Sequence, residues 1–346
     1  MRLYIVPIIT VACLLVSCRG EWFQHAAIPD SGDSHNGNDI NNGSDPENWT
    51  LVTELDLGSD YSQIEFVAIY NDWFYILGGS STGNFRWRLD GNTREELAWT
   101  GWPDGYHDGG VSCQNEERLY VLGGGGNSVF SPWHDFHWEV TDLQQQAWLI
   151  GGEHGYPVHN PAIANDDGHC ILIGGQLNSG TPTSAVQQFL TASETWDSLP
   201  ALPVEISLGA AALGEGVLLS AGGARSYEPG DSGTSYGVAV DWVYTLDLDA
   251  GGRDWQESPA LPMPLLLGTC IFVDGRFTFF GGMTNTGVAE NPYRAEIWSW
   301  SPGEENWQTE GGMPAASFHN NVLVHDGNVY LIVDQTGNHQ LYRWLR

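Results

Sequence analysis

Short apolar segments alternate with polar turns along the chain from about residue 48 onward. The clearest example is residues 273–282 (VDGRFTFFGG), where an Asp-Gly pair precedes an aromatic segment of strand length and a glycine pair follows it. Asp-Gly suits a two-residue β-hairpin turn because both central positions can adopt a positive φ. An apolar or small-residue segment also precedes the turn, so the pattern predicts a β-hairpin that ends in glycine.

This unit recurs six times, at intervals of 45 to 59 residues. The first glycine of the pair falls at Gly78, Gly123, Gly174, Gly222 and Gly281, and the sixth copy ends at 333–334 without its glycines. After a variable loop, each of the first five units continues with an aromatic strand and then a strand marked by a lone Trp. Six such units indicate one repeat domain rather than two average domains.

The N-terminal segment supplies the strand that the last unit lacks. Lone Trp residues follow the first five units, at Trp99, Trp148, Trp196, Trp255 and Trp307, and the chain stops before a sixth. The missing one is Trp49, in the segment 48–55. Pairing this segment with the last three strands would close a ring and hide both sheet edges.

The glycine pair, the aromatic strand, the spaced Trp and the LPALP segment at 199–203 together resemble kelch repeats. The resemblance covers about Asn48 to Arg346. It implies an all-β fold, a six-bladed β-propeller with four antiparallel strands per blade, closed by the N-terminal strand near Trp49. The missing glycines at 333–334 and the long interval after Gly222 depart from the pattern and leave the blade boundaries open.

The N-terminus has the pattern of an export signal. The apolar run 3–16 is too short to span a membrane and has the length of a signal-peptide core. It ends in LVSC, which resembles the lipobox of bacterial lipoproteins, where cleavage precedes a lipid-bearing Cys. We therefore expect a signal peptide at 1–17 and lipidation of Cys18; an ordinary signal peptide with an incidental Cys is the alternative.

The segment 18–47 is polar and acidic, with few apolar side chains to offset the entropy of ordering, so we expect a flexible tether before the propeller at 48–346. Arg19 stands where an Asp would retain a lipoprotein at the inner membrane. By family resemblance, this implies a lipid-anchored protein of the cell envelope, at the outer membrane or cell surface.

The composition narrows the classes of partner. The chain has 12 Lys+Arg and 43 Asp+Glu, a formal net charge of −31, and all its basic residues are Arg. An acidic surface repels phosphate backbones, which argues against nucleic-acid binding. The charge suits solubility or a salty medium; binding of cations or basic partners is the alternative.

The cysteines show no metal-ligand spacing, so we expect no zinc site. Without Cys13 and Cys18, three remain: Cys113, Cys170 and Cys270. Because Cys113 and Cys270 occupy equivalent apolar strand positions, we expect buried free thiols. A Cys113–Cys170 bridge between neighbouring units is the alternative.

Function is expected on one face of the ring. If the strands of a blade are labelled a to d from the axis outward, the d–a and b–c connections lie on the same face, and loops on a rigid scaffold usually carry function. His107, His159 and His319 stand at the start of strand a in three units. The alternative is that these imidazoles bond loop backbone.

The candidate ligand-binding residues combine the His positions with long b–c loops. Exposed aromatic rings beside Asn, Asp and Arg suit recognition of carbohydrate or peptide, although these aromatics could instead pack their own loops. The candidates are His107, Asp108, Trp133, His159, Asn160, Arg225, Tyr293, Arg294, His319 and Asn320.

Three functions compete. We expect a monomeric binding module for a protein or glycan ligand, without cofactor or metal. The alternative is a carbohydrate-modifying enzyme resembling N-acetylneuraminate epimerase, itself a kelch propeller, with Glu205 as the base and Arg225 as a carboxylate clamp. The third is a structural envelope protein without a small ligand. No Ser-His-Asp arrangement, phosphate loop or dinucleotide fingerprint is evident in the sequence.

The lipobox resemblance predicts that replacing Cys18 by Ser releases the protein from the membrane fraction, because the lipid has no other attachment point. Cell fractionation with metabolic palmitate labelling measures this. The matched control is Cys13→Ser, which should remain membrane-bound and labelled. A Cys18→Ser protein that still carries label and sediments with membranes would contradict the prediction.

Overall fold

The computed structural model describes residues 48–57, 66–77, 84–98, 107–126, 139–145, 147–149, 151–152, 158–166, 168–177, 180–229, 235–284, 293–317, 321–335 and 338–346. The chain divides into two compact units, Met1–Asp39 and Ile40–Arg346, and all of these residues belong to the second. Within them, no helix has the length and apolar character needed to cross a membrane. The expected signal peptide, Cys18 and tether lie outside the described residues.

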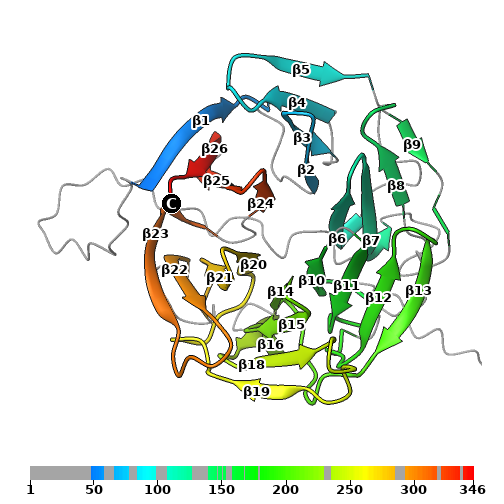
Figure 1. The fold of residues 1–346 in the computed structure, drawn as a ribbon, viewed down its shortest axis with the longest axis vertical. Coiled ribbons are helices and arrows are strands. Elements are labelled where there is room, and N and C mark those ends of the chain that lie inside the picture. The colour runs from blue at the N-terminus through cyan, green and yellow to red at the C-terminus, as the bar shows by residue number, and fades with distance from the viewer. Residues whose placement is uncertain are drawn as a thin grey trace, which may run out of the picture. The chain divides into compact units, whose positions relative to one another are not determined.

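The second unit consists of six four-stranded antiparallel sheets arranged as blades in a ring (Figure 1). Blade 1 contains β2 (Phe66–Tyr70), β3 (Trp73–Leu77), β4 (Asn84–Arg88) and β5 (Arg94–Leu97). Blade 2 contains β6 (His107–Asn115), β7 (Arg118–Gly126), β8 (Glu139–Asp142) and β9 (Ala147–Leu149). Blade 3 contains β10 (Ala162–Asn165), β11 (His169–Ile173), β12 (Val186–Leu190) and β13 (Thr195–Leu199).

The other three blades follow the same order. Blade 4 contains β14 (Ala210–Gly214), β15 (Val217–Ala221), β18 (Val243–Asp247) and β19 (Gln256–Ser258). Blade 5 contains β20 (Thr269–Val273), β21 (Arg276–Phe280), β22 (Arg294–Trp300) and β23 (Gln308–Ser317). Blade 6 contains β24 (Val322–His325), β25 (Asn328–Gln335), β26 (Asn338–Trp344) and β1 (Trp49–Leu55). Each innermost strand contacts the next, and β24 contacts β2, so the ring is complete.

The N-terminal strand closes the ring, as the sequence predicts. Strand β1 pairs antiparallel with β26, with Trp49 opposite Trp344. The two indole rings stack at 5.6 Å between centroids, and Trp49 Nε1 donates a hydrogen bond to the Gly312 carbonyl of blade 5 at 2.9 Å. The N-terminal strand therefore completes blade 6 and also attaches to its neighbour. The six-bladed propeller with its closing strand at Trp49 is confirmed.

The second strand of each blade is the most deeply buried. In β21, Phe277, Phe279 and Phe280 are all at most 1% exposed, and the same pattern holds in β3, β11 and β15. These strands are covered on both faces, because apolar clusters fill the space between adjacent blades, as in the cluster that joins blade 4 to blade 5. Burial on both faces explains why these segments are continuously apolar rather than alternating.

The predicted hairpin turns have the expected backbone. Asp274 and Gly275 have φ of +50° and +75°, and Asn71 and Asp72 have φ of +50° and +60°. Positive φ at both central residues defines the turn type that matches the twist of antiparallel strands. The prediction of two-residue turns between strands a and b is confirmed at these positions.

The glycine pairs connect neighbouring blades. The amide of the second glycine donates to a carbonyl that leads into strand a of the next blade: Gly124 to Val158 at 3.0 Å, Gly175 to Ile206 at 2.8 Å and Gly223 to Leu265 at 2.7 Å. The first glycine lies against the same carbonyl, and a Cβ on Gly222 would lie 2.6 Å from the Leu265 oxygen. Glycine is therefore required for close backbone approach as well as for positive φ.

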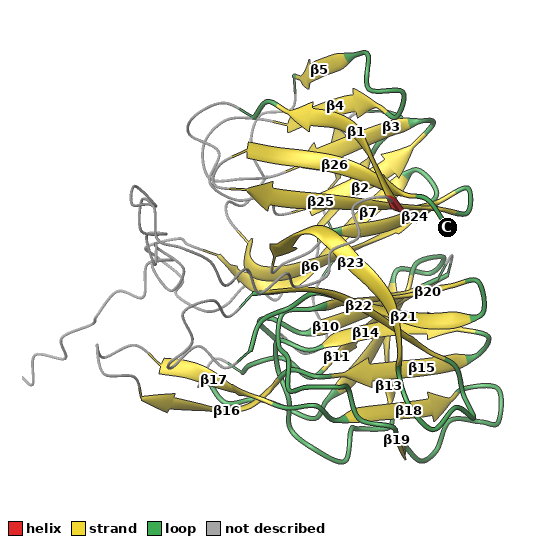
Figure 2. Cartoon of the chain, turned by 90° about the vertical axis from the view of Figure 1, so that its left-hand side faces the viewer, coloured by secondary structure: helices red, strands yellow, loops and turns green. Residues whose placement is uncertain are grey.

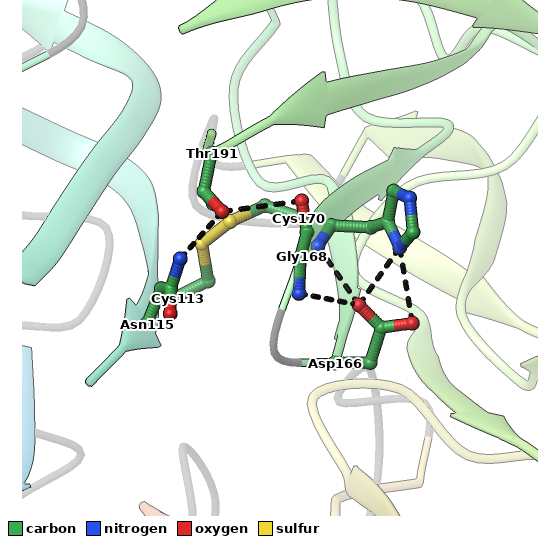
Figure 3. Close-up of a disulfide and its surroundings, with 7 residues drawn as sticks. Cys113, Asn115, Asp166, Gly168, Cys170 and Thr191 are labelled. Atoms are coloured by element: carbon green, nitrogen blue, oxygen red, sulfur yellow. Dashed lines mark hydrogen bonds and ion pairs between the residues drawn. A yellow bond between two sulfur atoms is a disulfide. The ribbon is translucent and has the colours of Figure 1, made fainter. Parts of the chain in front are cut away.

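Two of the expected free thiols form a disulfide instead. Cys113 in β6 and Cys170 in β11 are bonded, with Cα atoms 6.0 Å apart, and both are buried between blades 2 and 3 (Figure 3). The expectation was wrong because it relied on Cys113 and Cys270 occupying equivalent positions in their repeats. The disulfide instead joins the first strand of blade 2 to the second strand of blade 3. Cys270 is free and buried as expected, and burial raises the pKa of its thiol, which stays protonated.

Polar contacts beside the disulfide also connect blades 2 and 3. Asn115 Nδ2 donates to Thr191 Oγ1 at 2.6 Å, and this hydroxyl donates to the Gly168 carbonyl at 3.2 Å (Figure 3). The Asp166 carboxylate accepts the amides of Gly168 and His169, both at 2.8 Å, and so shapes the predicted polar turn.

The blade-to-blade contact predicts that Gly222→Ala lowers the free energy of unfolding by about 2–4 kcal/mol, the sum of backbone strain and local overpacking. The control is Gly251→Ala, where φ is +89° but nothing lies within 4 Å of the added Cβ. It should lose only about 1 kcal/mol. Urea or thermal unfolding of both variants measures the difference, and equal losses would show that the close approach is unimportant.

Candidate functional site

The loop face is the edge of the ring that carries the d–a and b–c connections, and the structure describes it most fully in blades 3 to 5. In each of these blades the d–a segment forms a β-bridge with the residue after the glycine pair: His159 with Gln176, Ser207 with Ala224 and Leu266 with Met283. Both backbone hydrogen bonds of each bridge are made, at 2.7 to 3.0 Å. These repeated bridges fix the position of the d–a segments.

A second set of hydrogen bonds runs from blade to blade along this face. The amide of Leu208 donates to the Asn160 carbonyl at 3.0 Å, and the amide of Leu267 donates to the Leu208 carbonyl at 2.8 Å. All three residues have positive φ, of +51° to +58°. We call this chain of bonds through Asn160, Leu208 and Leu267 the collar. It makes the loop face of blades 3 to 5 a rigid platform.

Asn160 occupies a structural position in the collar. Among non-glycine residues, Asn tolerates the left-handed conformation best, which accounts for its presence here without a ligand. Its side-chain amide lies 3.5 Å from Gln176 Oε1. His159, beside it, is half-buried and held by its backbone bridge. The structure thus gives both residues a role in the scaffold of the face.

The three predicted histidines are not in equivalent positions. In blade 3, His159 pairs with Gln176, the residue that follows the glycine pair. In blade 2 the corresponding residue, Gly125, pairs with Asp108, and His107 pairs with Gly126. The a–b turns do not differ: Gly124 comes six residues after Arg118, which pairs with Asn115, and Gly175 comes six residues after His169, whose carbonyl accepts the Asp166 amide. His107 simply lies one residue further from the turn than His159. Asp108 is therefore the counterpart of His159.

Several predicted residues lie outside what the structure describes. His319, Asn320 and Trp133 belong to this group, as do the side chains of His107 and Asp108. Their assignment to the ligand site stays a prediction.

Blades 4 and 5 share an apolar cluster on the loop face, which we call the platform cluster. Ala224, Leu266, Leu267 and Met283 are buried in it, and Leu208, Ala239 and Tyr293 pack against it. Tyr293 thus lies in the face as predicted, and burial raises the pKa of its hydroxyl. The cluster joins the d–a segments of both blades to the base of each b–c connection.

The predicted arginines flank this cluster. Arg225 directly follows Ala224 and is exposed, and it makes no ion pair with a described residue. Arg294 directly follows Tyr293, and its Nε is buried and has no hydrogen-bond partner among the described residues. The structure therefore brings Arg225, Tyr293 and Arg294 to one part of the face.

Glu205 lies on the neighbouring d–a segment. The bridge between Ser207 and Ala224 places Glu205 and Arg225 on adjoining backbone segments. Both side chains are exposed, and no ion pair joins them. A carboxylate and a guanidinium are thus available to a ligand on the same surface.

The long b–c connection of blade 4 contains strands that the sequence interpretation missed. Strands β16 (Ala224–Pro229) and β17 (Ser235–Ala239) pair as an antiparallel hairpin, with a register shift between Ala224 and Tyr227. Figure 2 shows the hairpin extending from blade 4 on the side opposite the C-terminus. The glycine-rich segment 230–234 between two β-prone segments was the available signal.

The described ranges contain no group of three or more His, Cys, Asp or Glu side chains placed to hold a metal ion. The loop face is thus a surface of guanidinium, carboxylate, phenol and apolar groups. Such a combination can bind a polar organic molecule through directional hydrogen bonds beside an apolar floor.

Comparison with known proteins gives two similarities. Over 179 residues the chain is 29% identical to the N-acetylneuraminate epimerase of Yersinia enterocolitica serotype O:8 / biotype 1B (strain NCTC 13174 / 8081). The aligned region covers 46% of this chain and 45% of that protein. The chain thus aligns with about half the length of this curated relative. No protein-family model matches the chain.

The solved structure of YjhT resembles the chain with a TM-score of 0.63 at 16% identity, covering 79% of this chain and 91% of YjhT. At this identity the likeness shows the β-propeller fold alone.

Proposed function

We propose that the chain is an exported, lipid-anchored propeller that binds carbohydrate through its loop face. The observation that carries the proposal is the 29% identity over 179 residues to a protein named for a sugar substrate. The rest of that relative is not matched, so the ligand class rather than its activity is what the similarity supports.

The chemistry of the loop face supports a carbohydrate ligand. Arg225 can donate several hydrogen bonds to a sugar carboxylate or to hydroxyl oxygens, and Glu205 can accept hydroxyl protons. Tyr293, which is only partly buried against the platform cluster, gives an apolar surface on which a sugar ring can pack. The remaining predicted contacts are His107, Asp108, Trp133, His159, Asn160, Arg294, His319 and Asn320.

The disulfide supports export from the cytosol. Structural disulfides persist in oxidising compartments and are rare in the reducing cytosol of mesophiles. The bond between Cys113 and Cys170 therefore agrees with the predicted signal peptide and with lipidation at Cys18.

We expect Arg225→Ala to weaken glycan binding roughly tenfold, because a charge-assisted hydrogen bond is lost. A glycan array identifies the ligand, and isothermal titration calorimetry measures the affinity. The control is Arg253→Ala, which removes an exposed Arg from the opposite face. Combining Arg225→Ala with Trp133→Ala should abolish binding while the melting temperature is unchanged. An array without binding above background would contradict the proposal and favour a structural protein.

A second candidate is a sugar-modifying enzyme, and the similarity to an epimerase favours it specifically. Glu205 could accept the proton of the anomeric hydroxyl while a water molecule protonates the ring oxygen as the sugar ring opens, with Arg225 binding the carboxylate. NMR of N-acetylneuraminate anomers should then show faster interconversion with the protein than without it. Glu205→Gln should remove the acceleration while binding persists. Unchanged interconversion rates with the wild-type protein would exclude this candidate.

A further inference from the structure

A polar cleft lies on the face opposite the loop face, where blades 1 and 6 meet. Its volume is about 430 Å³. Blade 1 contributes its a–b and c–d turns. Blade 6 contributes its a–b turn, the start of β25 and the end of β26. We call it the closure cleft and define it by Asp72, Arg88, Asp90, Asp326, Tyr330 and Arg343.

The floor of the closure cleft is fixed by the apolar core between the two blades. Tyr330 is 6% exposed and belongs to the cluster that contains Phe74 and Trp87 of blade 1. Leu89, which also lines the cleft, packs against this cluster, and its amide donates to the Asp72 carbonyl at 2.9 Å. The two blades therefore hold the cleft walls in a defined arrangement.

Two guanidinium groups in the cleft have spare donors. Arg343 lies opposite Tyr330 in the ladder of β25 and β26, and it makes no ion pair with a described residue. Arg88 reaches the Asp72 carboxylate only at 4.0 Å. By contrast, Arg118 and Arg276 are engaged by Glu194 and Glu304 at 2.9 and 2.8 Å.

The carboxylates of the cleft are also accessible. The side chains of Asp72 and Asp326 are 67% and 84% exposed, and the carboxylates do not converge on a common metal position. Asp72 has a φ of +60° at a turn position where blades 4, 5 and 6 have glycine, namely Gly216, Gly275 and Gly327. A carboxylate is thus present at a position that glycine would occupy with less strain.

These groups suit a ligand with both an anionic group and several hydrogen-bond donors. We propose that the closure cleft binds a small polyhydroxylated acid, such as a sugar acid. Its carboxylate would bind Arg88 and Arg343, and its hydroxyls would donate to Asp72, Asp90 and Asp326. The volume is within the range of small-molecule sites, roughly 300–1,000 Å³. This second site goes beyond the proposed function, because it lies on the other face and shares no residue with it.

A ligand in this cleft also joins the two blades at which the ring closes. Arg343 lies in β26, which pairs with the closing strand β1 at Thr50. A ligand that bridges Arg343 and Arg88 binds the closed ring and not the unfolded chain. Binding therefore raises the melting temperature in proportion to the logarithm of ligand concentration above the dissociation constant.

The experiment is calorimetric titration of the full chain with D-glucuronate, D-glucose and acetate at low ionic strength, with thermal unfolding in parallel. We expect D-glucuronate to bind and to raise the melting temperature. Arg343→Gln and Arg88→Gln should each lower the affinity for D-glucuronate roughly tenfold or more. Arg253→Gln, an exposed Arg on the same face outside the cleft, is the matched control and should bind normally.

The remaining outcomes separate this site from the loop face. Loss of D-glucuronate binding in Arg225→Ala, with Arg343→Gln unaffected, would overturn the closure cleft and leave the proposed function intact. Equal binding of D-glucose would overturn the proposal, because it would show that the guanidinium groups are unused. Equal binding of acetate, which has a carboxylate but no hydroxyl donor, would overturn it by showing that the aspartates are unused. No binding of D-glucuronate would also overturn the proposal. If Arg343→Gln unfolds, Asp326→Asn tests the same site from an exposed turn.

Discussion

The hydrogen bond from a glycine amide to the carbonyl at the start of the next blade is the contact on which the rest of the structure depends. It recurs at Gly124, Gly175 and Gly223 and needs two backbones closer together than any side chain allows. Each blade thereby sets the position of the following d–a segment. The collar and the platform cluster are consequences of that spacing, and so is the position of Tyr293 against the cluster.

Much of the fold could be predicted because the same constraint is repeated in sequence. Glycine pairs and Asp-Gly turns reveal their backbone conformation directly, so they give the blade number, and the unmatched Trp49 gives the closure. The disulfide could not be predicted in this way. A repeat pattern shows which positions are equivalent, whereas Cys113 and Cys170 are neighbours in different positions of adjacent blades.

The candidate site was predicted in part, for a similar reason. Arg225, Tyr293 and Arg294 could be assigned to the loop face from strand order alone. The equivalence of His107 and His159 failed because His107 lies one residue further from the a–b turn than His159, although the turn and the glycine pair are equally far apart in both blades. The closure cleft was not foreseen, since Asp72 and Arg343 are far apart in sequence and each resembles an ordinary solvated turn or strand-end residue.

The position of Trp49 has a mechanical consequence. The chain that precedes the propeller joins it at the strand which closes the ring, so a pulling force on the N-terminal side first loads the Trp49–Trp344 stack and the Trp49–Gly312 hydrogen bond. Because β1 is an outermost strand bonded to β26 and also to Gly312 of blade 5, such a load acts first on the outer edges of blades 5 and 6. The closing strand thus both completes the ring and receives any load from the chain that precedes it.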